Sequence, residues 1–338
     1  MKKIFFAVLA LAGLVACSNE DVVSRPQGAA IGFDNAFVEN ATRATDLTTA
    51  NLQDFGVYGT VAKGGNTALI FNNTKVYKGV DGFKYDVPQY WIAAAQYYFT
   101  AIAPYTNAKW SYATTTAHTG TISFNNAAAE ANQDLLFAYV KPEKTPAQIN
   151  TTPEKVGFTF NHMLSRVRFT FANGFGKDSN ITLQVYDVTI TDAYATADLA
   201  VADGIPADDW SNFNGTFSKN FGKVGGATLA TLTDTGDTKS AATEHFYLIP
   251  ANKTYNVTFK IDLYQAGVKL DTYTRTATIP AAGMQKGKSY DITTTLNYKN
   301  TSDDGTLYPI EFTVEKVENW DPATGGTDVN VVTPPANN

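Results

Sequence analysis

The sequence predicts an all-β protein built of two antiparallel β-sandwiches in series. Gly, Tyr, Phe, Thr and Asn are abundant, and these residue types suit half-buried pleated strands joined by turns. Segments with strand alternation recur along the chain between turn signals, and no segment has a helical pattern longer than a turn or two. Because the chain has 338 residues, more than one typical domain, we expect two domains.

A lipoprotein signal peptide is expected over residues 1–16. Two lysines precede an apolar run at residues 4–15, and the run Leu-Val-Ala-Cys that ends at Cys17 is a lipobox. Cys17 is the only cysteine of the chain, so we expect it to be acylated, and the alternative is a leftover free thiol. Acyl chains contribute about 0.8 kcal/mol per buried methylene, so more than one chain anchors the protein stably to a membrane.

The first strand of the fold is expected within residues 31–43. Ile31, Phe33 and Phe37 lie on one side of an extended chain, although the alternation is interrupted at Asn35. Burial of these three side chains would contribute roughly 1.5–3 kcal/mol each. That is a large share of the about 5–15 kcal/mol that holds a whole domain together.

Arg43 follows this strand at once, in a polar run of Asn, Ala, Thr and Asp. Cleavage after Arg43 would remove the strand and expose an apolar groove, which a strand from another copy could fill by strand addition. The other interpretation is an ordinary exposed loop arginine. From the residues alone both interpretations stay open.

The first domain is expected over residues 44–153, and its last part, residues 141–153, is a connector rich in Pro and Thr. Turn signals at residues 72–73 (Asn-Asn) and 81–82 (Asp-Gly) lie on either side of a short strand. A long aromatic strand ends before Pro104. The strands are predicted at residues 51–61, around Val76, and at residues 97–102, 119–124 and 134–140.

The second domain is expected over residues 154–338. Residues 181–191 alternate cleanly between apolar and polar side chains, and the turn at residues 265–267 (Gln-Ala-Gly) joins two of the strongest strands. Residues 213–232 have the pattern of a hairpin-rich region. The strands are predicted at residues 156–162, 167–171, 181–191, 213–221, 227–232, 246–250, 255–265, 268–276, 290–296 and 307–317, with a short one at residues 328–332.

The sequence gives no support for several classes of function. The net charge of −6 gives no basic patch for nucleic acid. The sequence has no metal-ligand spacing and no Gly-rich phosphate loop, so we expect no metal, no cofactor and no enzyme. Ser165 lies near His162 but lacks a nucleophile elbow, so we interpret His162 as a structural histidine. Trp110 and Trp210 lie in polar, loop-like sequence, where an exposed ring could stack on a sugar and the alternative is packing.

A series of short motifs is spaced over nearly the whole chain. They are the lipobox at Cys17, Tyr-Trp at 90–91 with Tyr-Tyr-Phe-Thr-Ala at 97–101, Asp-Leu-Leu-Phe-Ala at 134–138, Phe-Asn-His-Met-Leu-Ser-Arg-Val at 160–167, Phe-Tyr-Leu-Ile-Pro at 246–250, Gly-Lys-Ser-Tyr at 287–290 and Val-Glu-Asn-Trp at 317–320. In this order they resemble the fimbrillin (Mfa-like) family of type V pilins. The motif that contains His162 is the most specific of them.

The resemblance implies a lipoprotein precursor with two transthyretin-like β-sandwich domains. Family members are cut after an arginine by an Arg-specific protease at the cell surface, and the cut removes the first strand. Arg43 and Ala44 match the family's scissile bond, whereas Arg25 is followed by Pro26, which usually blocks cleavage. The resemblance therefore implies a lipidated propeptide over residues 17–43, with Ile31, Phe33 and Phe37 on the displaced strand.

The resemblance also implies polymerisation by donor-strand exchange, in which the vacated groove takes a C-terminal strand from a neighbouring pilin subunit. The candidate donor is residues 307–317, with Ile310, Phe312 and Val314 as its alternating apolar side chains, and residues 328–332 could extend it. The implied partners are other pilin subunits, the protease, the outer membrane through the lipid on Cys17, and a host or bacterial surface ligand. The product would be an extracellular adhesive pilus. The alternative is a non-polymerising outer-surface lipoprotein that binds glycan or host protein.

Overall fold

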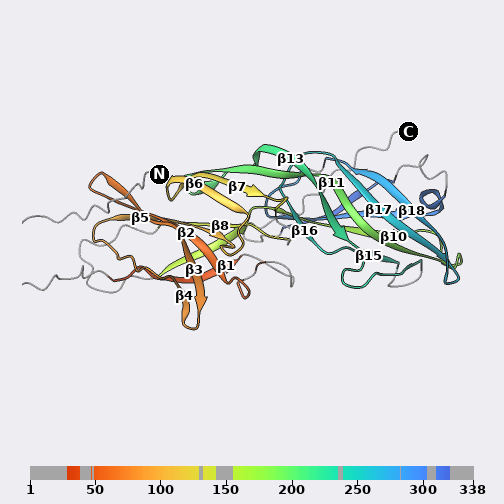
Figure 1. Ribbon diagram of the computed structural model, residues 1–338, viewed down its shortest axis with the longest axis horizontal. Coiled ribbons are helices and arrows are strands. Elements are labelled where there is room, and N and C mark those ends of the chain that lie inside the picture. The colour runs from red at the N-terminus through yellow and green to blue at the C-terminus, as the bar shows by residue number, and fades with distance from the viewer. Residues whose placement is uncertain are drawn as a thin grey trace, which may run out of the picture.

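The computed structural model describes residues 29–38, 47, 49–128, 132–141, 155–234, 239–281, 283–302 and 310–319. Within these residues the predicted all-β fold is confirmed, since β-strands are joined by turns and by one short 3-10 helix, η2 (Tyr298–Thr301). None of the described helical structure has the length and apolar character needed to cross a membrane. The molecule is elongated and has two lobes (Figure 1). The transthyretin-like detail stays a prediction.

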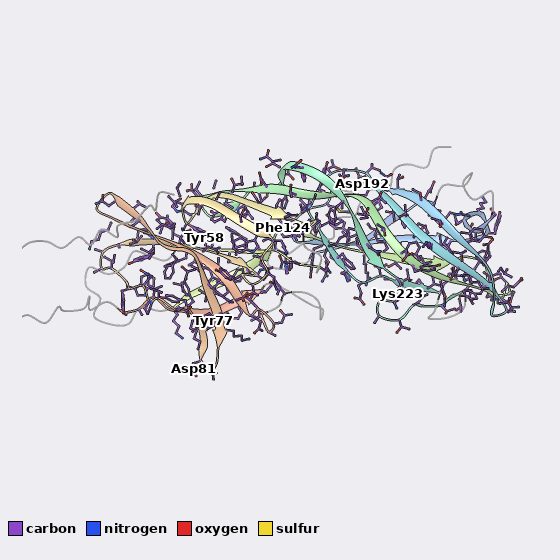
Figure 2. All side chains as sticks on the ribbon, in the orientation of Figure 1. Tyr58, Tyr77, Asp81, Phe124, Asp192 and Lys223 are labelled. Atoms are coloured by element: carbon purple, nitrogen blue, oxygen red, sulfur yellow. The ribbon has the colours of Figure 1, made fainter. Side chains whose placement is uncertain are left out.

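The first lobe is built on a seven-stranded sheet. The domain boundary predicted at residues 153–154 falls too early for this sheet, because the strand that follows it pairs with strands on both sides. Asp81 marks the turn of a hairpin that projects from the lobe (Figure 2). In sheet order the strands are β1 (Phe33–Val38), β9 (Val156–His162), β8 (Leu136–Val140), β5 (Gln96–Ala103), β2 (Asp54–Lys63), β3 (Asn66–Gly79) and β4 (Gly82–Lys84).

An eight-stranded sheet ties the two lobes together through its central strand, β11 (Ile181–Ala202). This strand has 22 residues and continues well beyond the predicted 181–191. Its first half pairs with a strand of the second lobe, and its second half pairs with a hairpin that comes from the first part of the chain. The other strands are β6 (Trp110–Thr116), β7 (Thr119–Asn125), β12 (Ile205–Pro206), β13 (Ser211–Gly222), β14 (Leu232–Thr233), β17 (Tyr255–Gln265) and β18 (Val268–Ile279).

The third sheet packs against the eight-stranded sheet and closes the core of the second lobe. Phe171 of this sheet and Phe259 of the eight-stranded sheet have ring centroids 4.9 Å apart. A separate apolar cluster that includes Tyr58 and Phe124 lies where β6 and β7 cover the first sheet (Figure 2). The strands of the third sheet are β10 (Ser165–Asn173), β15 (Ser240–Ala242), β16 (Phe246–Leu248), β19 (Lys288–Leu296) and β20 (Thr313–Asn319).

One lysine lies inside the second lobe. Lys219 of β13 is only 6% exposed, and its Nζ lies 5.4 Å from the ring centroid of Phe246 and 6.0 Å from that of Phe217. Burial lowers the pKa of Lys219 to about 8, because removing an ammonium from water disfavours the charged form. The two aromatic rings offset only part of this cost.

Replacing Lys219 with Met is expected to stabilise the protein at pH 7. The native state then no longer buries an ammonium, so the free energy of unfolding should rise by about 1–3 kcal/mol. Between about pH 8 and pH 10 the unfolded chain keeps the lysine proton that the native state has lost. The free energy of unfolding of the wild type therefore rises with pH in this range. The gain in free energy of unfolding from Lys219→Met should therefore be smaller at pH 9.5 than at pH 7. Urea unfolding at both pH values measures it, and Lys63→Met, at an exposed lysine, is the control.

Candidate functional site

The N-terminal segment at residues 29–38 lies in a groove of the first lobe. Its strand, β1, pairs in parallel with β9 from Phe33 onward. Just upstream, the Ile31 amide donates to the Gln89 carbonyl at 2.8 Å, and the Trp91 amide donates to the Ala29 carbonyl at 3.0 Å. The segment is therefore held on both sides, by β9 and by the chain that follows β4.

Phe33 fills a pocket made of aromatic rings. Its side chain is 1% exposed. The centroid distances from its ring are 5.5 Å to Phe71, 5.4 Å to Tyr85, 6.1 Å to Phe99 and 5.8 Å to Phe158. Such edge-on and offset pairs contribute about 0.5–1.5 kcal/mol each beyond burial. Sequence reasoning did not assign this pocket, because its four rings come from separate parts of the chain.

The predicted inward face of β1 is correct at its start and wrong at its end. Ile31 is buried as expected, and its carbonyl accepts a hydrogen bond from the Tyr85 hydroxyl at 2.6 Å. Phe37, expected to be buried, is 52% exposed. The register of the ladder shifts around position 35, so Ala36 and Val38 point inward in its place.

The chain that follows β1 returns to the end of this strand. The Val38 amide donates to Thr49 Oγ1 at 2.9 Å, and that hydroxyl also donates to the Val38 carbonyl. The two ends of the connection that contains Arg43 are therefore held together. Arg43 and Ala44 themselves lie outside the described residues, as does Cys17.

The candidate donor strand lies in the second lobe of its own chain. β20 pairs antiparallel with β19 at the edge of the third sheet, so the strand starts later than the predicted 307–317 and ends at Asn319. Ile310 and Phe312, just before it, are buried in the second core. Val314 is opposite Ile292 in the ladder, and its side chain lies outside the description.

Phe312 is well packed in this core. Its ring centroid lies 5.6 Å from that of Phe169, 5.9 Å from that of Phe171 and 6.1 Å from that of Phe259. These three rings come from both sheets of the second lobe. The side chain that the sequence assigns to the donor strand therefore also joins the two sheets of its own subunit.

The two tryptophans considered for sugar stacking differ in exposure. Trp210 is 4% exposed, and its Nε1 donates to the Met163 carbonyl at 2.9 Å. The idea that it lies exposed in a loop is wrong. Trp110 is half-buried, and its Nε1 donates to the Pro104 carbonyl at 2.7 Å. Trp210 is therefore packed, which was the alternative to sugar stacking.

The histidines have structural surroundings. His162 is fully buried at the end of β9, with Nδ1 2.8 Å from a carboxylate oxygen of the equally buried Asp134. This pair joins β9 to the chain just before β8. His118 stacks on Tyr98 at a centroid distance of 4.3 Å, and His245 is buried. None of these contacts sets a nucleophile beside a base.

A sequence profile described as fimbrillin-like matches residues 42–316. A fimbrial protein from Bacteroides vulgatus has a similar structure, with a TM-score of 0.61 at 17% identity, over 86% of this chain and 99% of that chain. A proposed cell adhesion protein from Bacteroides uniformis aligns with a TM-score of 0.46 at 16% identity, over 87% of this chain and 98% of that chain. No curated protein matches the sequence. At these identities the first structure shows a shared fold alone.

Proposed function

Because the chain belongs to the fimbrillin-like family, we propose that it is a structural, non-enzymatic subunit of a surface pilus that contributes to cell adhesion. The main observation in support of this proposal is that β1 pairs with β9 and buries Phe33 in an aromatic pocket. An edge strand that fills an aromatic pocket and is followed at once by a connection with an arginine is suited to removal and replacement. The name of the similar Bacteroides vulgatus structure, a fimbrial protein, agrees with it.

The proposed pathway starts with a precursor anchored to the outer membrane through acylated Cys17. An Arg-specific protease cuts between Arg43 and Ala44, and β1 then remains attached only by non-covalent contacts. Its departure opens the pocket of Phe33, and buried aromatic surface meets water at a cost of about 25 cal/mol per Å². A strand from another subunit refills the groove by adding to β9.

The C-terminal segment of a neighbouring copy is proposed as the incoming strand. Ile310 and Phe312 are separated by one residue, as are Ile31 and Phe33, so an extended segment can present the same two side chains on one face. In a free subunit these side chains are buried in the second lobe, so their transfer would require β20 to leave β19.

The variant Arg43→Ala tests this proposal against Arg25→Ala as the matched control. We expect Arg43→Ala to stay on the cell as a lipid-anchored monomer whose N-terminus is Cys17, and to form no filaments. Arg25→Ala should be processed to a free Ala44 and should assemble as wild type does, because Pro26 protects the bond after Arg25. N-terminal sequencing and electron microscopy measure both results. Normal filaments from Arg43→Ala would refute the strand exchange.

A further inference from the structure

The groove that holds the N-terminal segment has two walls of different kinds. The first wall is β9, whose Val156 amide donates to the Gly32 carbonyl at 2.8 Å. The second wall is residues 85–91, the chain that follows β4, which meets the N-terminal segment in an isolated bridge between Tyr90 and Ala30. Successive residues of an extended chain direct their backbone groups to opposite sides. Gly32 therefore faces the first wall, and its neighbour Ile31 faces the second.

The second wall binds both backbone polar groups of Ile31. The Ile31 amide donates to the Gln89 carbonyl at 2.8 Å, and the Ile31 carbonyl accepts from the Tyr85 hydroxyl at 2.6 Å. The Gln89 amide donates to the same hydroxyl at 3.2 Å, which closes a ring of three hydrogen bonds. Burial raises the pKa of Tyr85, so the hydroxyl keeps the proton that it donates.

Most of the second wall is exposed to solvent. Val87 is 68% exposed and Tyr90 is 45% exposed, whereas Trp91 at the end of the wall is buried. The Trp91 amide donates to the Ala29 carbonyl at 3.0 Å, so this end also depends on the N-terminal segment. Segments with few buried contacts open locally at a low cost in free energy. Contacts with the bound strand are therefore a large part of what keeps the second wall closed.

We propose that residues 85–91 close over the strand that occupies the groove, and that Tyr85 is the positioning residue that couples strand binding to closure. The strand gives an amide to the Gln89 carbonyl and a carbonyl to the Tyr85 hydroxyl. Both groups belong to the residue two positions before the aromatic ring that fills the pocket of Phe33. That residue cannot be proline, because proline has no N–H to donate.

The second wall thus adds a backbone requirement to the side-chain requirement of the pocket. In the candidate donor strand, Ile310 precedes Phe312 by two residues, as Ile31 precedes Phe33. Ile310 has the N–H and the carbonyl that the second wall would bind. This application to an incoming strand rests on the proposed function, whereas the coupling itself is a property of the uncleaved chain.

Hydrogen exchange of the uncleaved full chain, measured by NMR in the Arg43→Ala, Cys17→Ser background, tests the coupling. Tyr85→Phe removes the hydroxyl and keeps the ring. Because the hydroxyl joins both sides, the amides of Ile31, Gln89 and Trp91 should exchange roughly 3- to 10-fold faster, the usual effect of one hydrogen bond on an opening equilibrium. Amides of β5 should keep their wild-type rates. Unchanged exchange at the three amides, or equal acceleration throughout the first lobe, would overturn the proposal.

Tyr77→Phe is the matched control for the loss of a hydroxyl. Tyr77 lies on the hairpin that turns at Asp81, and its hydroxyl donates to a carboxylate oxygen of Asp86 at 2.9 Å (Figure 2). This bond joins β3 to the second wall and does not involve the bound strand. The Ile31 amide should therefore exchange at the wild-type rate in Tyr77→Phe. Equal acceleration at Ile31 in the two variants would contradict a specific role of Tyr85.

A change in the strand should in turn open the second wall, because coupling between two sites is reciprocal. Phe33→Ala should accelerate exchange at Gln89 and Trp91, whereas Phe37→Ala, at an exposed side chain, should not. Wild-type exchange at both amides in Phe33→Ala would refute the coupling. These measurements need neither protease nor filaments, so their failure is distinguishable from failure of strand exchange, which the filament assay of Arg43→Ala decides.

Discussion

Replacing Phe33 with alanine is expected to lower the free energy of unfolding of the first lobe by about 3–5 kcal/mol, the usual cost of a buried Phe-to-Ala change. The physical reason is the void left among Phe71, Tyr85, Phe99 and Phe158, which surround the ring. These rings belong to a packed sheet and cannot close the space fully. Urea unfolding of the uncleaved Arg43→Ala precursor, followed by tryptophan fluorescence, measures the loss.

Phe37→Ala is the matched control, because it removes the same side chain from the same strand. Phe37 is 52% exposed, so its loss should change the free energy of unfolding by no more than about 0.5 kcal/mol. Equal losses in the two variants would mean that Phe33 does not anchor β1. A small loss of free energy of unfolding in Phe33→Ala would mean that neighbouring side chains move into the space that the Phe33 ring leaves.

The loss of stability expected for Phe33→Ala explains why a groove that has lost β1 would need a new strand. A domain is held by about 5–15 kcal/mol. Removal of the segment at residues 29–38 takes away Phe33 together with Ile31, Ala36 and Val38, all of them buried. A cleaved subunit without a replacement would therefore approach the limit of its stability. We therefore expect a strand that offers a Phe to this pocket to restore most of the lost stability.

The local signals of the sequence located most of the long strands but not β6, which begins at Trp110, and they did not identify which strands pair. Alternation identified Ile31 and Phe33 as inward-facing, because side-chain direction in a regular strand has a period of two. It failed at Phe37, since one shift in register near Asn35 reverses every later side chain. The interruption at Asn35 was visible in the sequence, but its effect on direction depends on the ladder with β9.

Long-range pairing explains the other differences. β9 follows a Pro- and Thr-rich connector, which is a typical domain boundary, yet it pairs with β1 and β8 of the first sheet. β11 continues to Ala202 because β7 offers it a partner from the first half of the chain. The aromatic pocket was not predicted for the same reason. Which aromatic residues meet is decided by sheet order, and sheet order has no local signal.

Removing residues 307–338 is expected to abolish filament assembly and also to destabilise the second lobe. The deletion takes Ile310 and Phe312 out of the core and leaves the edge of β19 without β20. Loss of a buried Phe and a buried Ile costs about 5–10 kcal/mol together, so the lobe should unfold at much lower urea concentration. Filament counts after proteolytic processing and urea unfolding of the monomer measure the two effects separately.

Removing only residues 322–338 separates assembly from stability, because Ile310, Phe312 and β20 remain. The free energy of unfolding should then stay close to that of the wild type. If this short deletion also abolishes filaments, the donor strand includes residues beyond β20, such as 328–332. If it leaves filaments intact while the long deletion does not, Ile310, Phe312 and Val314 suffice, and β20 must leave β19 during exchange. Filaments of normal length from the long deletion would mean that the C-terminal segment is not the donor, because that chain lacks Ile310, Phe312 and Val314.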